Sequence, residues 1–494
     1  MTRPSVPAFA TVPVTLVAVA VAAVLTALSG RYGYHRDELY FRVAADHLAW
    51  GYTDQPPLTP LLAKLSMAVF GDTPMGLRVV ATLSAALTVV VVALIARELA
   101  GERNAQILAA ACTALAGFVL GTGHMVSTAT FDLLAWMVIA LFALRLLRTN
   151  DGRWWIALGL TTGIAVENKY LVVLPLAALL IAVLITGPRS ILKTWYFPAG
   201  IAVAALIAAP NLIWQATNDW PQLTVAGGIS EDDGTENRIM FVPLQIAQLS
   251  PFLVPVWIAG FLRLWRTPAL RWSRPVALSY PVLCVIVLAT GGKSYYALPL
   301  LLVLVAAGTQ PTLDWLHRGR QPVRRAVFAT AAVLTAITSA AFTLPVLPAS
   351  AVNLVLPVNA EQGEQVGWPE LAATARTVWE QIPVGERDRA VLFAGNYGEA
   401  GALAKYNDGL PPAYSGHMSY ADWTPPTDDH DGPVVLVTQE RSPQYEAHFG
   451  TCTDAARVDN GQDVDNEEQG AHVLLCAGPT KPWSALWPDL RRYY

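Results

Sequence analysis

Two adjacent acids, Asp37 and Glu38, follow the first long apolar stretch of the chain and begin its chemically richest segment. They come within about three helical turns of the end of that stretch, so they lie near a membrane surface, where unpaired ionisable groups are costly. Successive residues of a helix point about 100° apart, so the two carboxylates are expected to serve different partners rather than act as one dyad. An interfacial helix cap flanked by tyrosine and arginine anchors is an equally good interpretation.

Polar residues in later loops on the same predicted side of the membrane extend this pattern. They are Asp54 and Gln55 in the first loop, His124 and Asp132 in the second, Lys169 in the third, Arg238 in the fourth, and Lys293, Tyr295 and Tyr296 in the fifth. The positive-inside rule does not account for outer lysines, whereas a cation there suits an anionic ligand such as a lipid phosphate. Carboxylates beside it suit a general base, or a divalent cation shared with the phosphate. Together these loops predict group transfer from a phosphate-linked donor.

Single members of this set have simpler interpretations. Asp132 begins a predicted helix, where the helix dipole favours an acid, so it could serve only as a cap. Lys169 lies between two predicted spans, and a lone lysine there can extend its stem to reach the interface. The functional prediction therefore depends on the set rather than on any one residue.

Membrane helices are the elements that must position these residues. Of the 494 residues, 54% are hydrophobic and only 14% are charged, and the mean hydropathy is +0.40. Soluble domains carry about a quarter charged residues, so much of this chain is dissolved in lipid. About eleven stretches approach the roughly 20 apolar residues that a span needs. They are 9–29, 75–96, 104–121, 131–148, 154–167, 170–187, 196–214, 243–263, 276–291, 295–311 and 326–346.

The orientation of the spans follows from their loops. The first stretch is expected to be an uncleaved anchor, because no clear small-residue cleavage site precedes a soluble chain and further spans follow. Alternate loops carry arginine clusters, as at 145–153, 263–274 and 318–325, and such loops stay in the cytoplasm. Eleven spans are an odd number, so they place the C-terminal domain on the side opposite the N-terminus. The sequence therefore predicts a multi-pass protein of the cell membrane with an extracytoplasmic C-terminal domain. Two short stretches, 154–167 and 276–291, could be tilted, broken or re-entrant.

The chain is predicted to divide into a transmembrane domain, 1–349, and a soluble α/β domain, 350–494. The second part contains acidic clusters and apolar runs bounded by turn residues. Its strands are expected at 389–394, 433–438 and 471–476, with a helix at 399–406.

Three features of the C-terminal part bear on its role. The loop 395–398 is too short and irregular to predict nucleotide binding. The aromatic stretch 414–423 could stack on a sugar or pack the domain onto the bundle. Cys452 and Cys476 are expected to form a disulfide in an oxidising compartment. By contrast, Cys112 and Cys284 lie in predicted spans, as apolar residues.

Several motifs occur in one order along residues 31–299. They are Asp37-Glu38, Tyr52-Thr-Asp-Gln-Pro-Pro-Leu58, Phe131-Asp132, Asn168-Lys169-Tyr170, Pro210-Asn211-Leu-Ile-Trp214-Gln215, Asn218-Asp219-Trp220-Pro221 and Lys293-Ser-Tyr295-Tyr296-Ala-Leu-Pro299. As a set they resemble the GT-C glycosyltransferases of glycosyltransferase family 39, the protein O-mannosyltransferase and aminoarabinose transferase group. Protein O-mannosyltransferases often have His-Pro-Pro where this chain has Asp54-Gln55-Pro56-Pro57. That departure weakens the prediction that the acceptor is a protein.

The resemblance implies an inverting transferase that moves a sugar from a polyprenyl-phosphate carrier to an acceptor hydroxyl on the outer face. The acceptor would belong to a lipid, a cell-wall glycan or a protein. Asp37 would be the catalytic base, and Glu38 would help to place the acceptor. Lys169 and Lys293 would hold the donor phosphate and stabilise the leaving group. Further candidates are Arg238 and Tyr295 for the phosphate, and Asp54, Gln55, His124, Asp132 and Tyr296 as substrate-binding or supporting residues.

Members of that family differ over whether a metal is needed. A divalent metal ion is therefore a candidate cofactor, with Asp37, Asp132 and His124 as candidate ligands. The other expected partners are membrane lipids, and no nucleic acid is expected.

A lipid or glycolipid transporter or flippase is the alternative function. Transporters tend to place charges near the membrane midplane and to contain internal repeats. In this sequence the charges fall at predicted helix ends on one side, and no convincing repeat is present. The pattern favours an enzyme that acts at the membrane surface.

Overall fold

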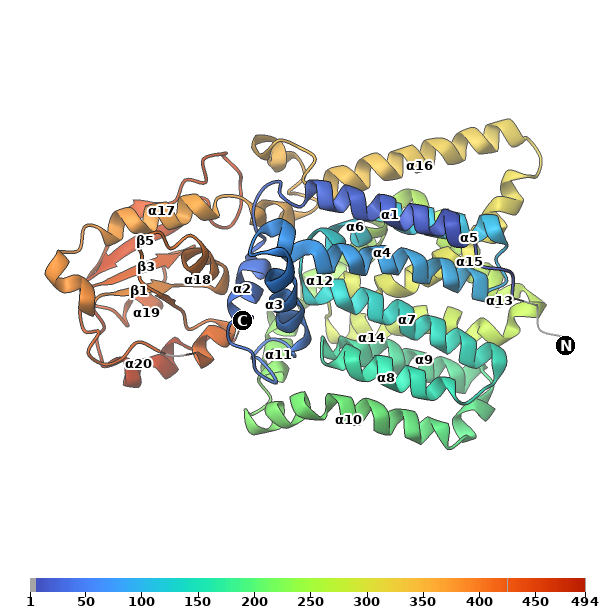
Figure 1. Ribbon diagram of the computed structural model, residues 1–494, viewed down its shortest axis with the longest axis horizontal. Coiled ribbons are helices and arrows are strands. Elements are labelled where there is room, and N and C mark those ends of the chain that lie inside the picture. The colour runs from blue at the N-terminus through green and yellow to red at the C-terminus, as the bar shows by residue number, and fades with distance from the viewer. Residues whose placement is uncertain (1–5, 424, 494) are drawn as a thin grey trace.

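The computed structural model describes residues 6–423 and 425–493, and the chain forms two parts (Figure 1). Long helices form a bundle, and a smaller α/β domain packs against one end of it. The described part of the chain begins at the other end of the bundle. Two short helices, α2 (Arg36–Ala44) and α3 (Leu58–Phe70), occupy the junction. The C-terminal part of the chain therefore lies beside its first loop.

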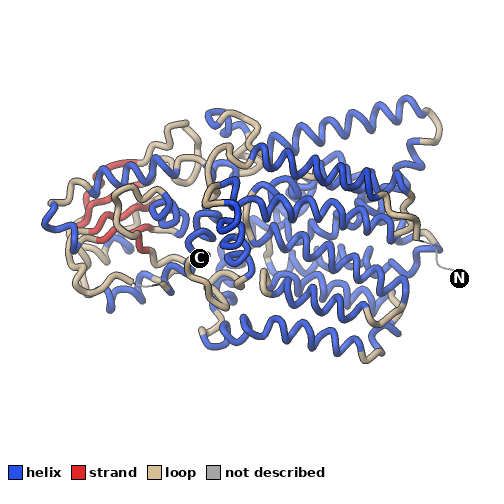
Figure 2. Tube along the Cα trace, in the orientation of Figure 1, coloured by secondary structure: helices blue, strands red, loops and turns tan. Residues whose placement is uncertain are grey.

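The bundle is built from helices that are apolar over most of their length, and most run along the long axis of the molecule (Figure 2). They are α1 (Thr11–Leu28), α4 (Pro74–Glu98), α5 (Arg103–Leu115), α6 (Gly117–His124), α7 (Thr128–Thr149), α8 (Trp154–Val166), α9 (Val173–Thr186), α10 (Tyr196–Thr217), α11 (Pro221–Asp232), α12 (Gly234–Leu249), α13 (Val254–Arg266), α14 (Arg274–Thr290), α15 (Leu298–Leu316) and α16 (Gln321–Thr343). This arrangement confirms the predicted polytopic membrane protein.

The number of clear spans is lower than the sequence predicted. Within the described residues, 7 helices are long and apolar enough to cross a membrane, or up to 9 if each of two bent pairs is one span. The pairs are α5 with α6, bent by 60°, and α12 with α13, bent by 84°. The other two predicted stretches form the shorter helices α8 and α9. The stretch predicted as 276–291 is longer than expected, because a helical segment from Pro268 precedes it.

Glycines allow one helix pair of the bundle, α13 and α15, to approach closely. A Cβ atom on Gly260 of α13 would lie 1.8 Å from the carbonyl oxygen of Leu304 on α15. A Cβ atom on Gly308 of α15 would lie 1.8 Å from the carbonyl oxygen of Val256 on α13. Small residues at such contacts let backbones pack without a large hydrophobic driving force, as is usual in membranes.

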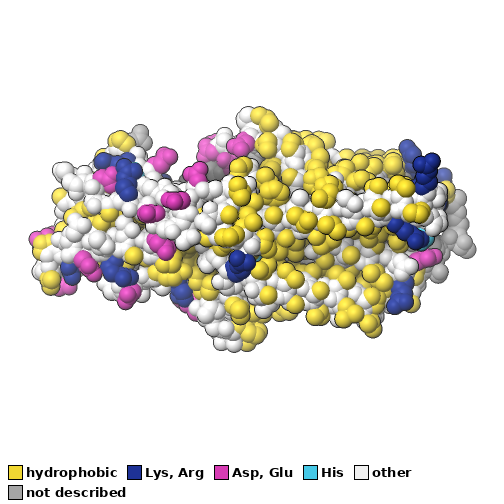
Figure 3. Space-filling model, turned by 90° about the horizontal axis from the view of Figure 1, so that it is seen from above, with side chains coloured by type: hydrophobic (Ala, Val, Ile, Leu, Met, Phe, Trp, Pro, Cys, Tyr) yellow, Lys and Arg dark blue, Asp and Glu magenta, His cyan; other side chains and the backbone are white. Residues whose placement is uncertain are grey.

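Charge is distributed unevenly over the surface (Figure 3). Hydrophobic side chains cover the middle of the bundle, and Lys and Arg side chains gather at the end far from the α/β domain. Acidic side chains are frequent on the α/β domain itself. An apolar belt with one basic end is what the positive-inside rule expects of a membrane protein.

The C-terminal domain contains a five-stranded sheet in the order β2-β1-β3-β5-β4. The strands are β1 (Val391–Ala394), β2 (Ala413–Tyr414), β3 (Val434–Thr438), β4 (Cys452–Arg457) and β5 (His472–Cys476). β1 pairs in parallel with β2 and β3, whereas β5 is antiparallel to β3 and β4. The predicted strands correspond to β1, β3 and β5. The sequence analysis did not find β2, which is very short, or β4, whose residues are mostly polar and not buried.

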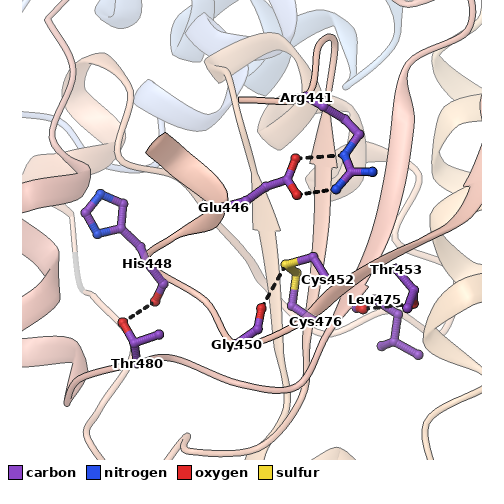
Figure 4. The surroundings of a disulfide bond; sticks show 9 residues. All are labelled: Arg441, Glu446, His448, Gly450, Cys452, Thr453, Leu475, Cys476 and Thr480. Carbon is purple, nitrogen blue, oxygen red and sulfur yellow. Dashed lines mark hydrogen bonds and ion pairs between the residues drawn. A yellow bond between two sulfur atoms is a disulfide. The ribbon is translucent and has the colours of Figure 1, made fainter. Parts of the chain in front are cut away.

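Helices cover the sheet and join it to the bundle. They are α17 (Trp368–Trp379), α18 (Tyr397–Lys405), α19 (Pro443–Glu446) and α20 (Trp483–Leu490). Cys452 and Cys476 form a disulfide that joins β4 to β5 (Figure 4). The other two cysteines are free, and Cys112 is buried. We propose the domain boundary between residues 349 and 350, after α16 ends.

Candidate active site

Asp37 and Glu38 both lie in the first turn of α2, which His35 caps. The His35 Nδ1 atom accepts a hydrogen bond from the Asp37 N–H at 3.2 Å. In return, the Glu38 Oε2 atom accepts one from the His35 N–H at 2.9 Å. This reciprocal capping box satisfies donors that a helix start would otherwise leave free. It also fixes the direction in which each carboxylate leaves the helix.

Glu38 is fully buried and forms an ion pair with Arg78 of α4. Its Oε2 atom lies 2.7 Å from Arg78 Nη2, and Arg78 Nε donates to its Oε1 atom at 2.9 Å. The Val126 N–H donates to Oε1 as well, at 3.0 Å. Both oxygens therefore have partners inside the protein. These contacts hold α2 against α4 and against the segment before α7.

Asp37 points instead towards the C-terminal domain. The hydroxyl of Tyr397, in the first turn of α18, donates to its Oδ1 atom at 2.9 Å. The carboxylate is only partly buried. The sequence analysis did not find Tyr397, because the two residues are 360 positions apart. Asp37 thus remains the acid of the pair that a substrate can reach.

Asp54 lies on the same side of α2 and is held by two hydroxyl groups. Tyr40 donates to its Oδ1 atom, and Ser419 of the C-terminal domain does so at 3.4 Å. Burial raises the pKa of Asp54 to about 6, although the Tyr40 hydrogen bond opposes the increase. The neighbouring Gln55 is 2% exposed, and neither atom of its amide has a hydrogen-bond partner among the described residues.

Lys169 and Tyr295 bring the third and fifth loops together. The Lys169 Nζ atom donates to the Tyr295 hydroxyl at 3.2 Å and lies 5.7 Å from the centre of the Tyr296 ring. A cation from one loop and two phenols from another therefore meet at one end of the bundle.

Asp132 does not cap its helix, so the simple capping interpretation is wrong. Ser127 is the N-cap of α7, and it forms a capping box with Thr130. Asp132 lies deeper, is 5% exposed and accepts a hydrogen bond from Trp136 Nε1 at 2.9 Å. Asp132 is therefore a buried acid with a hydrogen-bond partner on its own helix.

The remaining two predicted cations have other contacts. Arg238 donates through Nε to the carbonyl oxygen of Leu288 at 3.0 Å, where α14 ends, and so caps that helix. Lys293 lies 3.7 Å from a carboxylate oxygen of Asp233 and is 41% exposed. It also interacts electrostatically with Glu361. Of the three cations, Lys169 is the one that the described contacts join to Tyr295.

The structure adds polar residues around α2 that the sequence analysis missed. His35 Nε2 lies 2.9 Å from a carboxylate oxygen of Glu361, in the segment that precedes α17. Arg36 Nη1 lies 2.9 Å from Glu467 of the C-terminal domain. The only available signal was the charge of these residues, since their partners are hundreds of positions away.

The aromatic stretch 414–423 packs the C-terminal domain onto the junction. The Trp423 ring stacks on His47 with centres 4.5 Å apart and lies 6.2 Å from the Tyr40 ring. The Thr53 N–H donates to Ser419 Oγ at 2.9 Å. Of the two interpretations of this stretch, packing is therefore the one that the contacts support.

The three candidate metal ligands do not form one ligand set. His124 accepts a hydrogen bond from the guanidinium of Arg78 at 3.3 Å, and a fixed cation there opposes a second one. Asp37 is bound by Tyr397, and Asp132 by Trp136. Among the described residues, no group of three or more His, Cys, Asp or Glu side chains could hold a metal ion. These residues do not fit a resident divalent ion.

Comparison with known proteins gives one family match. Residues 54–214 match the family model described as dolichyl-phosphate-mannose-protein mannosyltransferase. The match covers Asp54, His124, Asp132 and Lys169, whereas Asp37 and Glu38 lie before it. No match is found among curated protein sequences.

Solved structures show the same fold. ArnT from Cupriavidus metallidurans bound to undecaprenyl phosphate is 17% identical, with a TM-score of 0.57, over 94% of this chain and 99% of that chain. Arabinofuranosyltransferase AftD from Mycobacteria is 15% identical, with a TM-score of 0.52, over 94% of this chain and 40% of that chain. The chain thus has the GT-C fold, a membrane bundle with a C-terminal α/β domain.

The class of the protein follows from the fold and the family match together. It is a membrane glycosyltransferase, as the motifs of its outer loops predicted. Within that class, the predicted resemblance to GT-C glycosyltransferases of family 39 is confirmed.

Proposed function

We propose that this protein transfers a sugar from a polyprenyl-phosphate carrier to an acceptor hydroxyl on the outer face of the membrane, with inversion at the anomeric carbon. The observations that carry the proposal are the partly buried carboxylate of Asp37, which accepts a hydrogen bond from Tyr397, and the contact of Lys169 with Tyr295 at the same end of the bundle. A carboxylate and a cation at one site suit proton removal from an acceptor and stabilisation of a phosphate leaving group. The solved relative bound to undecaprenyl phosphate supports a polyprenyl-phosphate donor.

In this mechanism Asp37 accepts the proton of the acceptor hydroxyl. The acceptor oxygen attacks the anomeric carbon while the bond from that carbon to the phosphate oxygen breaks, and the polyprenyl phosphate leaves. Lys169 and the Tyr295 hydroxyl stabilise the charge that develops on the phosphate. Tyr397 orients Asp37 by its hydrogen bond. No step is assigned to a metal ion.

The outer location of the site is part of the proposal. The basic end of the bundle lies away from the α/β domain (Figure 3), which favours a cytoplasmic basic end. The disulfide between Cys452 and Cys476 favours an oxidising compartment for the C-terminal domain. Nucleotide sugars are not expected there, so a lipid-carried donor fits the location.

The test is transfer by purified protein in liposomes with a panel of synthetic polyprenyl-phosphate pentoses and hexoses. The measured quantity is the release of polyprenyl phosphate that depends on an added acceptor. Asp37→Asn should lower the rate by about 10²–10⁴-fold, because it removes the general base. Asp46→Asn is a matched control, since Asp46 is an exposed acid just beyond the end of α2. Undiminished transfer by Asp37→Asn contradicts the assignment.

A second variant tests the cation. Lys169→Met should lower the maximal rate by about 10²–10³-fold, as loss of one stabilising donor does in other enzymes. Arg238→Met serves as the comparison, because Arg238 caps α14 instead of meeting Tyr295. Equal losses in the two variants would mean that a general loss of positive charge, not the phosphate site, causes the effect.

A further inference from the structure

A polar crevice opens in the C-terminal domain where β1 and β3 end. Its volume is about 540 Å³, and ligand pockets are usually about 300–1,000 Å³. Gly395 and Asn396, which follow β1, form one side of the crevice, and Gln439, which follows β3, forms another. The loop and short helix α19 after β3 complete the wall.

The topology of the sheet marks this place as a binding position. The chain passes from β1 through α18 to β2 on one side, and later returns to β3 on the other side of β1. Both neighbours are parallel to β1. In open α/β sheets, ligands bind outside the carboxyl ends of the strands at such a switch point. The crevice lies at that point.

The charges of the crevice favour an uncharged ligand. Arg441 and Arg492 line it, but so do Glu440 and Asp489, so the cations and carboxylates are balanced. Arg441 is also paired with Glu446, with Nε donating to Oε1 at 2.8 Å (Figure 4). A site for a phosphate or a carboxylate would need an excess of positive charge.

The start of α18 offers little to an anion either. The Asn396 N–H donates to Glu399 at 3.0 Å, and the Glu399 N–H donates to Asn396 at 2.8 Å. The Tyr397 N–H donates to His417 at 3.4 Å. Anion sites at helix starts depend on free N–H groups, and these three already have acceptors.

What the crevice does offer is amide and hydroxyl groups beside an aromatic ring. Asn396, Gln439, Thr438 and Ser442 line it. The Tyr445 hydroxyl is buried and has no hydrogen-bond partner among the described residues, which is costly in a folded protein. A neutral, polyhydroxylated ligand could satisfy that hydroxyl and the side-chain amides together.

The crevice lies beside the proposed catalytic base. Asn396, in its wall, directly precedes Tyr397, which binds Asp37. Gln439, in the opposite wall, donates to Glu467 at 3.1 Å, and Glu467 pairs with Arg36 of α2. Two links thus connect the crevice to the first turn of α2.

We propose that this crevice binds a neutral saccharide of the acceptor, so that the acceptor is a glycan. The assignment rests on the proposed function for its role in transfer. The disulfide between Cys452 and Cys476 supports the wall of the crevice. His448 lines the crevice, and the segment that follows it leads to Cys452 (Figure 4).

The test measures direct binding to the full-length protein in lipid nanodiscs, without a donor. The probes are trisaccharides of arabinose, mannose and galactose, with trigalacturonate as an anionic comparison. Ser442→Trp fills the crevice and should weaken binding of the neutral probe at least about tenfold, the change that roughly 1.4 kcal/mol produces. Ser442→Ala is the comparison, because it removes the same hydroxyl, which accepts a hydrogen bond from the Tyr445 N–H, so the additional loss in Ser442→Trp measures the filling of the crevice.

A second pair of variants tests the unpartnered hydroxyl. Tyr445→Phe should weaken binding about threefold to tenfold, the usual effect of one hydrogen bond. Tyr406→Phe is the control, since Tyr406 follows the other end of α18. The proposal is overturned if no neutral probe binds, if Ser442→Trp binds as tightly as wild type, or if trigalacturonate is preferred.

Transfer assays separate this inference from the proposed function. Asp37→Asn should bind the trisaccharide like wild type and fail to transfer. If a neutral probe binds but no polyprenyl-phosphate donor supports transfer, the acceptor role is overturned together with the proposed function. If transfer reaches lipid acceptors while no trisaccharide binds, the proposed function stands and the crevice assignment is overturned.

Discussion

Asp37 and Glu38 are adjacent in sequence, but their carboxylates have different partners. Glu38 is buried against Arg78, whereas Asp37 faces the C-terminal domain and meets Tyr397. Breaking a buried ion pair by removing one partner usually costs about 3–5 kcal/mol, because the other charge is left uncompensated. The family resemblance gave Glu38 a role in placing the acceptor, and we propose instead that it positions α2.

Glu38→Ala should therefore destabilise the protein by about 3–5 kcal/mol, and Glu38→Gln should destabilise it less, because its one remaining carbonyl oxygen still accepts part of these hydrogen bonds. The measurement is thermal unfolding in detergent, together with transfer by the folded fraction. Glu231→Ala, at an exposed acid, is the control. A Glu38→Gln variant with normal stability and no transfer would contradict a positioning role and favour direct contact with the acceptor.

Asp54 should make the stability of the fold depend on pH. Its pKa is raised from the usual 3.8 to about 6, chiefly by burial. The neutral carboxyl therefore stabilises the fold below the unfolded-state pKa, and this contribution is lost as the pH rises through the folded-state value. We expect Asp54→Asn to be more stable than wild type by about 1–2 kcal/mol near pH 7 after allowance for solvent screening, and nearly equal near pH 4.

Replacing Asp72 should change the stability near neutral pH in the opposite direction, so this residue provides the control. Arg42 and Lys405 hold its pKa at about 2, against the effect of burial. Its ionised form thus stabilises the fold above the unfolded-state pKa, so Asp72→Asn should be less stable than wild type near neutral pH. Thermal unfolding scans of both variants across this pH range check the pair, and the same sign in both would contradict the argument.

Among the elements, the contact between α2 and α18 sets the position of Asp37, the proposed base, relative to Tyr397. A Cβ atom on Gly401 of α18 would lie 2.8 Å from the Leu39 Cβ atom and 2.9 Å from its carbonyl carbon. The backbones of the two helices are therefore close together, and overpacking such a contact typically costs about 1–3 kcal/mol. Tyr397 lies one turn earlier on the same helix.

Gly401→Ala should push α18 away from α2 and separate Tyr397 from Asp37. We expect the transfer rate to fall about tenfold, equivalent to roughly 1.4 kcal/mol in the barrier. Gly385→Ala is the matched control, because a Cβ atom there meets nothing within 4 Å. An unchanged rate for Gly401→Ala would show that the helix contact does not govern the position of the base.

The sequence could predict elements more readily than contacts between them. Apolar runs identified the membrane helices, and apolar strands identified β1, β3 and β5, because both signals are local. The bends inside α5–α6 and α12–α13 were missed, since they depend on single residues such as Ser250, whose φ is 129°. Arg78 was missed too, because one arginine in a predicted span shows no sign of its partner.

At the scale of the whole molecule, the site is shared by two domains. The bundle supplies Asp37, Lys169 and Tyr295, and the C-terminal domain supplies Tyr397 and the crevice beside it. A base that one domain carries and the other orients works only when both are docked. This explains why the resemblance in the membrane helices alone left the role of residues 350–494 open.

The orientation of the molecule follows from the same arrangement and can be tested directly. In a variant whose free Cys112 and Cys284 are replaced by alanine, Val384→Cys places a thiol on the C-terminal domain, where Val384 is 76% exposed. Arg318→Cys places one at the exposed loop between α15 and α16. Because basic loops stay in the cytoplasm, a membrane-impermeant maleimide should label intact cells at position 384 and not at 318. Permeabilised cells should be labelled at both, and labelling of intact cells at 318 alone would reverse the orientation and place the site on the cytoplasmic face.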